Sequence, residues 1–316
     1  MKYTLNKIFF ITFITFFLSI SYVKAEIKVV TSIKPIHSLA TLLMEGIGSP
    51  KLIVDGSNSP HNFSLKPSHA KMLQNADLVF WVGEDIETFL EKPLKTVAVK
   101  ARKIELMKIS QLKKLKFREK NIFEGHDDHG HGKKDDHGHG KKDDHGHAHG
   151  EYDPHIWLDP LNAKIILNEM AKNMKAMDNK NTSKYDANLI QANKKIDNLV
   201  SNINKNINKK AKYVVFHDAY QYFENRFGLK TLGALTVNTD VLPGVEQLKD
   251  IREVIKEEKA KCIFSEPQFN PKIIKAIAKD TNIKTGVLDP LGADIKNNKD
   301  LYFKLLNNLS NSLKKC

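Results

Sequence analysis

The chain has 316 residues, of which 41% are hydrophobic and 28% are charged, and its formal net charge is +13 at pH 7. This length is enough for one large domain or for two ordinary ones of about 100 to 150 residues each. The lysines are interleaved with Asn and Glu on expected helix faces, which indicates a solvated basic surface and argues against a nucleic-acid partner.

The N-terminal 25 residues have the pattern of an export signal. Two lysines precede an apolar run at 8–20, and the small Ala25 stands before Glu26. The run is shorter than the about 20 residues that a membrane-spanning helix needs, and no later stretch supplies one. We therefore expect a soluble mature protein that begins at Glu26, lies in the periplasm and has no lipid anchor, because no cysteine is near the cleavage point. Three lysines and no acids leave with the signal, so the net charge of the mature chain becomes +10.

Short β-rich runs then alternate with helical patterns. The expected strands lie at 27–32, 51–56, 77–83, 213–218, 261–266 and 284–290. This order predicts an α/β fold with two lobes, each a parallel sheet flanked by helices, in which ligands bind beyond the carboxyl ends of the strands. We expect the N-terminal lobe to span 26–181 and the C-terminal lobe to span 209–316.

The segment 123–152 differs from its surroundings because DDHGHGKK-like units repeat with a period of eight. It lacks core residues, so we expect a disordered loop inserted in the first lobe. Imidazole and carboxylate suit zinc, nickel or copper, which predicts weak metal binding without selection of one metal. A solubilising linker is the alternative. The eight histidines concerned are His126, His129, His131, His137, His139, His145, His147 and His149.

A long amphipathic helix is expected at 182–208, between the two series of strands. Ser183 can cap it. Its apolar residues recur at steps of three and four from Tyr185 to Ile207. About 25 residues at 1.5 Å each span about 38 Å, enough to join two lobes. The alternative is an ordinary helix packed inside one domain.

Cys262 and Cys316 are the two cysteines of the chain. In an oxidising compartment, a pair with no competing thiol indicates a disulfide. It would close a loop of 54 residues, which contributes about 4 kcal/mol in the chain-entropy model. Free thiols or a metal-binding pair are the alternatives.

Three histidines stand where such a fold places ligands. His61 follows the strand at 51–56, His155 lies in DPHIWLDP, and His217 ends the strand YVVF. Three imidazoles make a tetrahedral zinc site with one position open for water or a carboxylate, and Asp289 after the strand at 284–290 is the best-placed carboxylate.

Four further residues are assigned structural roles. His37 and His69 lie in helical patterns that begin near a proline, which favours packing or surface roles. Trp157 is expected to pack in the core. Asp159 before Pro160 predicts a helix cap.

Several longer motifs accompany these residues. They are TSIKPIHSLA, SPHNFSLKPS, ADLVFWVGE, the His-rich insertion, DPHIWLDP, VFHDAYQYFE, FSEPQF and LDPLG. With them, the chain resembles the zinc-binding members of the metal-specific solute-binding proteins (cluster 9, or A-I) that serve bacterial ABC importers. The resemblance covers nearly all of the mature chain.

The resemblance implies that His61, His155 and His217 bind the metal, with Asp289 coordinating directly or through water, and that the two cysteines pair. One position departs from the family, because some zinc-binding relatives carry Glu where this chain has Pro60. Manganese-binding relatives usually replace the third histidine by glutamate, so His217 favours zinc.

These observations lead to one main hypothesis and several alternatives. We expect a non-enzymatic monomer that captures Zn²⁺ in the periplasm and delivers it to a membrane permease with its cytoplasmic ATPase. A nickel, copper or manganese binding or buffering protein and an adhesin-like relative are alternatives. A zinc hydrolase is a further one, but the sequence has no HExxH motif or other obvious base beside the ligands.

Overall fold

A computed structural model describes residues 26–316 apart from 119, 124–149, 238 and 240–242. The expected signal peptide and the eight histidines of the repeat therefore lie outside the described residues. Within the described part, no helix combines the length and the apolar character needed to cross a membrane.

The first lobe is built on a parallel four-stranded sheet in the order β2-β1-β3-β4. Its strands are β1 (Val29–Ile33), β2 (Lys51–Val54), β3 (Leu78–Trp81) and β4 (Arg102–Glu105). The helices around it are α2 (Lys34–Leu43), α3 (Pro67–Gln74), α4 (Thr88–Thr96) and α5 (Pro160–Met177). The central strands β1 and β3 are buried along their whole length, as expected for a parallel sheet covered on both faces.

The second lobe repeats this architecture with the order β6-β5-β7-β8, again all parallel. Its strands are β5 (Tyr213–His217), β6 (Gly233–Thr236), β7 (Cys262–Ser265) and β8 (Lys284–Val287). Its helices are α7 (Gln221–Phe227), α8 (Val245–Glu257), α9 (Lys272–Thr281) and α10 (Leu301–Lys314). Three short 3-10 turns precede this lobe in the chain, at Leu106–Lys108, Ile156–Leu158 and Asn179–Asn181. The predicted fold class, with two parallel α/β lobes, is confirmed.

Two strands were not expected from the sequence. β4 reads RKIE and lies at an edge of its sheet, where charged side chains remain exposed. β6 reads GALT, which is short and has no run of β-branched or aromatic residues. Pairing with the adjacent strands β3 and β5 therefore determines that these segments are strands, more than the β propensity of their own residues does.

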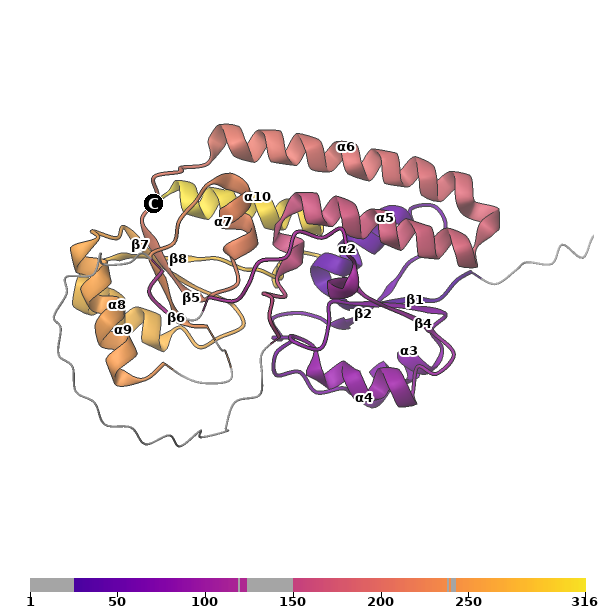
Figure 1. The fold of residues 1–316 in the computed structure, drawn as a ribbon, viewed down its shortest axis with the longest axis horizontal. Helices are drawn as coiled ribbons and strands as arrows, with labels where there is room; N and C mark the ends of the chain where they lie inside the picture. The colour runs from indigo at the N-terminus through magenta and orange to yellow at the C-terminus, as the bar shows by residue number, and fades with distance from the viewer. Residues whose placement is uncertain (1–25, 119, 124–149, 238, 240–242) are drawn as a thin grey trace, which may run out of the picture.

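The long helix α6 (Thr182–Asn206) links the two lobes and has 25 residues. Figure 1 shows it running along both lobes at the top of the view. It packs on α5, α2 and α10, and its buried residues belong to the predicted apolar stripe. The helix follows the turn Asn179–Asn181, so Asn181 takes the cap position and Ser183 lies inside the first turn. We propose lobe limits of 26–181 and 209–316 on this arrangement.

A second connection lies just before the His-rich segment. Ile122 forms an antiparallel bridge with Gly233 of β6, and the Phe123 amide donates to the Leu232 carbonyl at 3.0 Å. At the other end of the segment, Tyr152 bridges Lys116. The two ends of the expected 123–152 loop therefore make ordered backbone contacts, and one of them lies on the second lobe.

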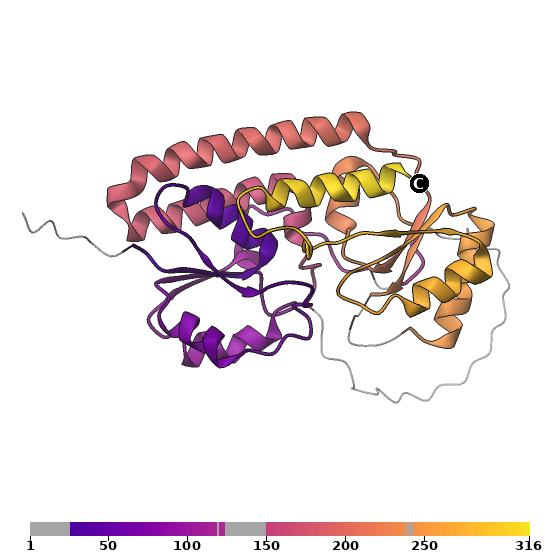
Figure 2. The ribbon, with the colours of Figure 1, turned by 180° about the vertical axis from the view of Figure 1, so that it is seen from behind.

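The C-terminal helix α10 also joins the lobes. It packs on α2 and α6 of the first half of the chain, and its far end reaches the second sheet (Figure 2). There Cys316 forms a disulfide with Cys262 of β7, with a Cα–Cα distance of 5.7 Å. The predicted disulfide is confirmed.

Candidate metal centre

Three histidines from both lobes meet between the sheets. His61 lies in the loop after β2, His155 directly precedes the turn Ile156–Leu158, and His217 is the last residue of β5. One ring nitrogen of each lies within 4.8 Å of the others. No second group of histidine, cysteine and carboxylate side chains among the described residues meets this distance. His61 and His217 lie at the carboxyl ends of β2 and β5, where parallel sheets generally bind ligands.

The three rings enclose a small cavity. Their centroids are 4.9 to 5.8 Å apart, and the cavity has a volume of ≈ 10 Å³, which is about the room of one water molecule or one ion. His155 and His217 are buried, while His61 is partly exposed. Pro60, Ile86, Trp157, Phe269, Pro290 and Leu291 supply the apolar part of the wall, and Ser59, Glu266 and Gln268 supply polar side chains. The ring nitrogens therefore share a partly apolar wall with one carboxylate, one amide and one hydroxyl.

A carboxylate stands behind His155. Asp153 Oδ1 lies 2.7 Å from His155 Nδ1 and also accepts the His155 backbone amide at 2.9 Å. Burial, with a smaller effect of His217, lowers the pKa of His155 well below its ordinary value, so this ring stays neutral. An ionised Asp153 can only accept, which places the ring proton on Nδ1 and leaves the Nε2 lone pair for a metal. Burial raises the pKa of Asp153 to about 7.

A second carboxylate stands behind His217. Glu266, in the loop after β7, has Oε2 3.3 Å from His217 Nδ1. Burial by itself lowers the pKa of His217, but the charge and hydrogen bond of Glu266, helped by Asp218 and Asp153, outweigh it and raise that pKa. Glu266 is itself buried. Its position leaves Nε2 directed away from the carboxylate, an arrangement that metal-binding histidines commonly have.

Sequence reasoning missed both carboxylates, although each carried a signal. Asp153 stands two residues before His155 in DPH, so a short turn can bring the two side chains together. Glu266 follows the strand that contains Cys262, and the rule that singled out His217 at the end of its own strand applies to it equally.

Asp289 does not join the group of three histidines. Its Oδ1 accepts hydrogen bonds from the Gln268 side chain at 2.9 Å and from the amides of Leu291 and Gly292 at 3.0 and 2.9 Å. Its Oδ2 accepts the Ala293 amide at 2.5 Å. The carboxylate therefore organises the loop that follows β8, and this loop supplies part of the cavity wall.

The other two histidines have structural partners. His37 in α2 has Nε2 3.2 Å from the Pro50 carbonyl. His69 in α3 accepts the Lys66 amide on Nδ1 at 3.1 Å, which caps that helix. Asp159 caps α5 by accepting the Leu161 amide at 2.8 Å, as predicted.

Trp157 combines a packing role with a place in the cavity wall. Its side chain is fully buried, and its ring centroid is 5.3 Å from that of His155. Its Nε1 donates to the Pro290 carbonyl at 2.8 Å. The predicted packing role therefore holds, with the addition that the indole ties the two lobes together beside the histidines.

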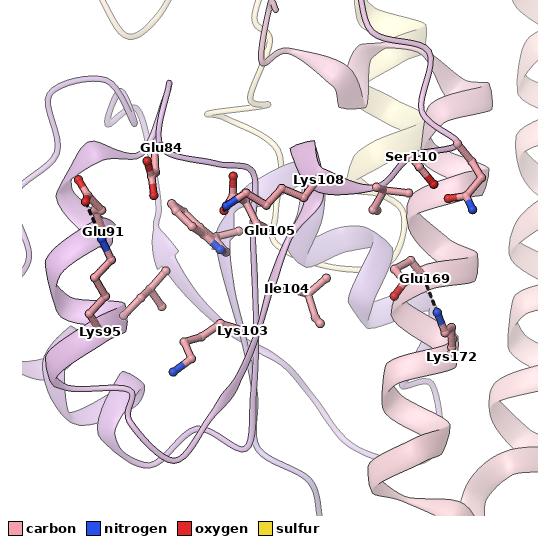
Figure 3. Close-up of a pocket in the computed structure, with 14 residues that line it drawn as sticks. Glu84, Glu91, Lys95, Lys103, Ile104, Glu105, Lys108, Ser110, Glu169 and Lys172 are labelled. Atoms are coloured by element: carbon pink, nitrogen blue, oxygen red, sulfur yellow. Dashed lines mark hydrogen bonds and ion pairs between the residues drawn. The ribbon is translucent and has the colours of Figure 1, made fainter. Parts of the chain in front are cut away.

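A larger hollow of ≈ 600 Å³ lies elsewhere in the first lobe, between α4, β4 and α5. Figure 3 shows glutamates and lysines around it, with Glu91 paired to Lys95 and Glu169 paired to Lys172. No histidine lines it. Its charges are mixed and partly neutralised in pairs, so it offers none of the metal chemistry of the histidine group.

Comparison with known proteins places the chain among zinc-uptake components. The family model described as "Zinc-uptake complex component A periplasmic" matches residues 29–316. A high-affinity zinc uptake system protein ZnuA from Brucella abortus is 47% identical over 304 residues, covering 91% of each chain. The protein of the same name from Yersinia pestis is 39% identical and covers 92% of each chain. A crystal structure of ZnuA aligns with a TM-score of 0.73 at 22% identity, covering 91% of this chain and 99% of that one, and supports the fold.

Proposed function

Because this chain belongs to the family of zinc-uptake complex component A, a periplasmic family, we propose that it captures one zinc ion and delivers it to a membrane importer. The observation that carries the proposal is the group of three histidines around a cavity with room for a single ion. The partner is a permease driven by a cytoplasmic ATPase, and the chain acts as an exported monomer whose signal is the segment 1–25.

His61, His155 and His217 are the proposed ligands. Three neutral imidazoles around one ion form the first part of a tetrahedral zinc shell at about 2.0 to 2.1 Å per bond. Asp153 and Glu266 hold two of the rings by Nδ1. The metal would bridge the two lobes, because the ligands come from both.

Asp289 is expected from the sequence to coordinate the metal, but in this proposal it has a structural role. Four donors already occupy its two oxygens, so it would have to give up some of these bonds to coordinate a metal. We propose that it shapes the loop beside the site and that water completes the zinc shell.

The donor set favours zinc over manganese. Manganese prefers oxygen ligands, and this group has three imidazoles and no carboxylate oxygen within reach of all of them. Copper and nickel also bind imidazole, so a competition series at the three-histidine site is the measurement that separates a zinc carrier from a copper or nickel buffer. A cavity of ≈ 10 Å³ has no room for an ester or peptide substrate, and the family is a transport component, so we assign no enzymatic activity.

The His-rich segment is proposed to act as a weak zinc reservoir. Eight histidines with neighbouring aspartates offer many partial ligand sets. The described ends of the segment lie on the second lobe at Phe123 and on the first lobe at Gly150, whose amide donates to Asp85 Oδ1 at 3.0 Å. The segment therefore starts and ends on the two lobes that hold the site.

Zinc uptake by cells tests the proposal directly. In cells that depend on this chain, the triple variant His61→Ala, His155→Ala and His217→Ala should abolish high-affinity zinc accumulation and growth under chelation, and added zinc should restore growth. His37→Ala is the matched control and should accumulate zinc like the wild type. Wild-type uptake by the triple variant would refute the proposal.

A further inference from the structure

Lys34 is a buried charged residue that the metal site does not use. It is the first residue of α2, at the carboxyl end of β1, and its side chain is only 3% exposed. Its Nζ donates to the carbonyl oxygens of Ala293 at 2.6 Å and Ile295 at 2.9 Å. Both acceptors belong to the loop after β8 of the second lobe. Burial of an ammonium group is costly, and here the two hydrogen bonds and the charges of Asp55, Asp289 and Asp294 offset that cost.

The same loop is fixed on its other side by Asp289. The amides of Leu291, Gly292 and Ala293 all donate to that carboxylate. Gly292 has φ of +72°, a backbone conformation that lets the loop turn back sharply. Amides thus face Asp289 while carbonyls face Lys34, so opposite charges hold the two sides of one short backbone segment.

This loop forms part of the wall of the histidine cavity. Pro290 and Leu291 line the cavity directly. The Pro290 carbonyl accepts the Trp157 side chain, whose ring contacts His155. A shift of the loop would therefore move two wall residues and loosen the indole beside a proposed ligand.

The chain beyond the loop continues along the first lobe before α10 begins, as Figure 2 shows in yellow. Ser38 Oγ donates to the Asn298 carbonyl at 2.8 Å, and Asn297 donates to Asp55 at 2.8 Å. Lys299 pairs with Glu45 at the surface. Lys34 is the buried charged residue among these contacts, and its acceptors lie in the same loop as the wall residues Pro290 and Leu291.

We propose that Lys34 is a positioning residue for metal retention: it holds the 290–295 loop of the second lobe against the first lobe, so that the loop keeps the metal site closed. The inference rests on the proposed function, since it concerns the ion held by the three histidines. Lys34 contacts no ligand, so its effect acts through the loop and changes how fast the metal leaves more than how it is recognised.

The test compares zinc release from the full mature chain loaded with one equivalent of zinc. Lys34→Met keeps the length and apolar stem of the side chain and removes its donors. We expect release into an excess of a chromophoric chelator to become about tenfold faster, with a smaller change in the association rate. Lys299→Met is the matched control, because it removes a lysine that pairs at the surface with Glu45, in the chain that follows the same loop. It should release zinc within about twofold of the wild-type rate.

Each outcome decides the inference. A folded Lys34→Met protein that releases zinc at the wild-type rate overturns it. If Lys34→Met does not fold, Trp157→Phe decides instead: it removes the bond to Pro290, and faster release supports the loop's role while an unchanged rate overturns it. A wild-type chain that holds zinc no better than the triple-histidine variant would refute the proposed function, whatever the Lys34 result.

Discussion

Carboxylates behind the histidines determine how well these rings can bind a metal. A neutral imidazole has one nitrogen with a free lone pair, and the hydrogen bond on the other nitrogen fixes which one this is. Asp153 and Glu266 provide that bond for His155 and His217. The affinity of the site should therefore depend on two carboxylates outside the group of three histidines.

The first prediction concerns Glu266→Gln. The amide keeps the size of the side chain but loses the charge that favours a proton on Nδ1 of His217. Zinc affinity should fall by about 10-fold to 100-fold, the usual effect of losing such a partner, measured by competition with a chelator of known affinity. Asp197→Asn is the control, because that carboxylate is 59% exposed and pairs with Lys164 away from the site. An unchanged affinity in Glu266→Gln would show that His217 needs no orienting partner.

The second prediction concerns pH. Zinc needs His217 neutral and Asp153 ionised as an acceptor, yet Glu266 outweighs burial to raise the pKa of His217, and burial raises the pKa of Asp153 to about 7. Both groups therefore take up protons more readily than usual, so binding is strongest above both pKa values and weakens as the pH falls through them. His155 adds little, because burial lowers its pKa.

We expect the affinity to decrease by up to about tenfold per pH unit for each proton displaced, between about pH 7.5 and about pH 6. Calorimetry in buffers of different ionisation enthalpy would count the protons released on binding. A constant affinity over this range, with no proton release, would contradict the assigned states of His217 and Asp153.

The third prediction separates two roles of Asp289. If the carboxylate organises its loop, Asp289→Asn should lower the free energy of unfolding of the metal-free protein by about 1 to 3 kcal/mol, through loss of charge-assisted hydrogen bonds. It should leave one zinc bound per chain. Denaturant unfolding and a zinc titration of the same sample measure both. Unchanged stability with zinc binding lost, as in a histidine variant, would mean that Asp289 is a ligand.

The grouping of the three histidines could be predicted because each follows a recognisable strand or lies in a recognisable motif. His217 ends an apolar strand, and His61 follows another. The contact between His217 and Glu266 could not be predicted from the sequence. The two residues lie 49 positions apart, and their contact depends on the pairing of β5 with β7. Periodicity gives the elements of a sheet, but it does not give the order in which strands pair.

At the level of elements, long apolar runs and helical stripes were sufficient to predict three strands of each sheet and the linker α6, but not β4 or β6. The segments that cross between lobes were harder to predict. Ile122 adds to the edge of β6 through a short backbone bridge and packs its side chain on the second-lobe core, and a single apolar residue leaves no periodic pattern in the sequence. α10 has an ordinary amphipathic sequence. Its position against α2 depends on hydrogen bonds between Ser38 of α2 and two residues, Asn298 just before α10 and Tyr302 in its first turn.

The fourth prediction concerns the disulfide that fixes the end of α10. Replacing Cys262 and Cys316 by Ser should lower the free energy of unfolding by about 4 kcal/mol, because the open chain gains the entropy of a long loop. Zinc affinity should change by less than about threefold, because neither sulfur lies in the cavity wall. Unfolding in denaturant with and without reductant provides the measurement. Equal stability of the oxidised protein and the double variant would contradict this account.

At the scale of the whole molecule, several covalent connections join the lobes. Within the described residues they include the segment that leads to Phe123, the helix α6, and the segment from Asp289 to α10. Two of them are pinned by hydrogen bonds across the lobes, at Leu232 and at Lys34. The histidines of the two lobes are therefore held close together by the protein itself, and the metal adds a bridge between parts that already touch.

The central claim is that one tight zinc site is made by His61, His155 and His217 and not by the histidine repeat. Calorimetric titration of zinc into the mature protein without residues 126–149, beside the same protein with all three histidines changed to Ala, tests this most directly. The account predicts one tightly bound zinc in the first protein and none in the second. Tight binding that disappears with the repeat and survives in the triple-alanine variant of the full chain would contradict it.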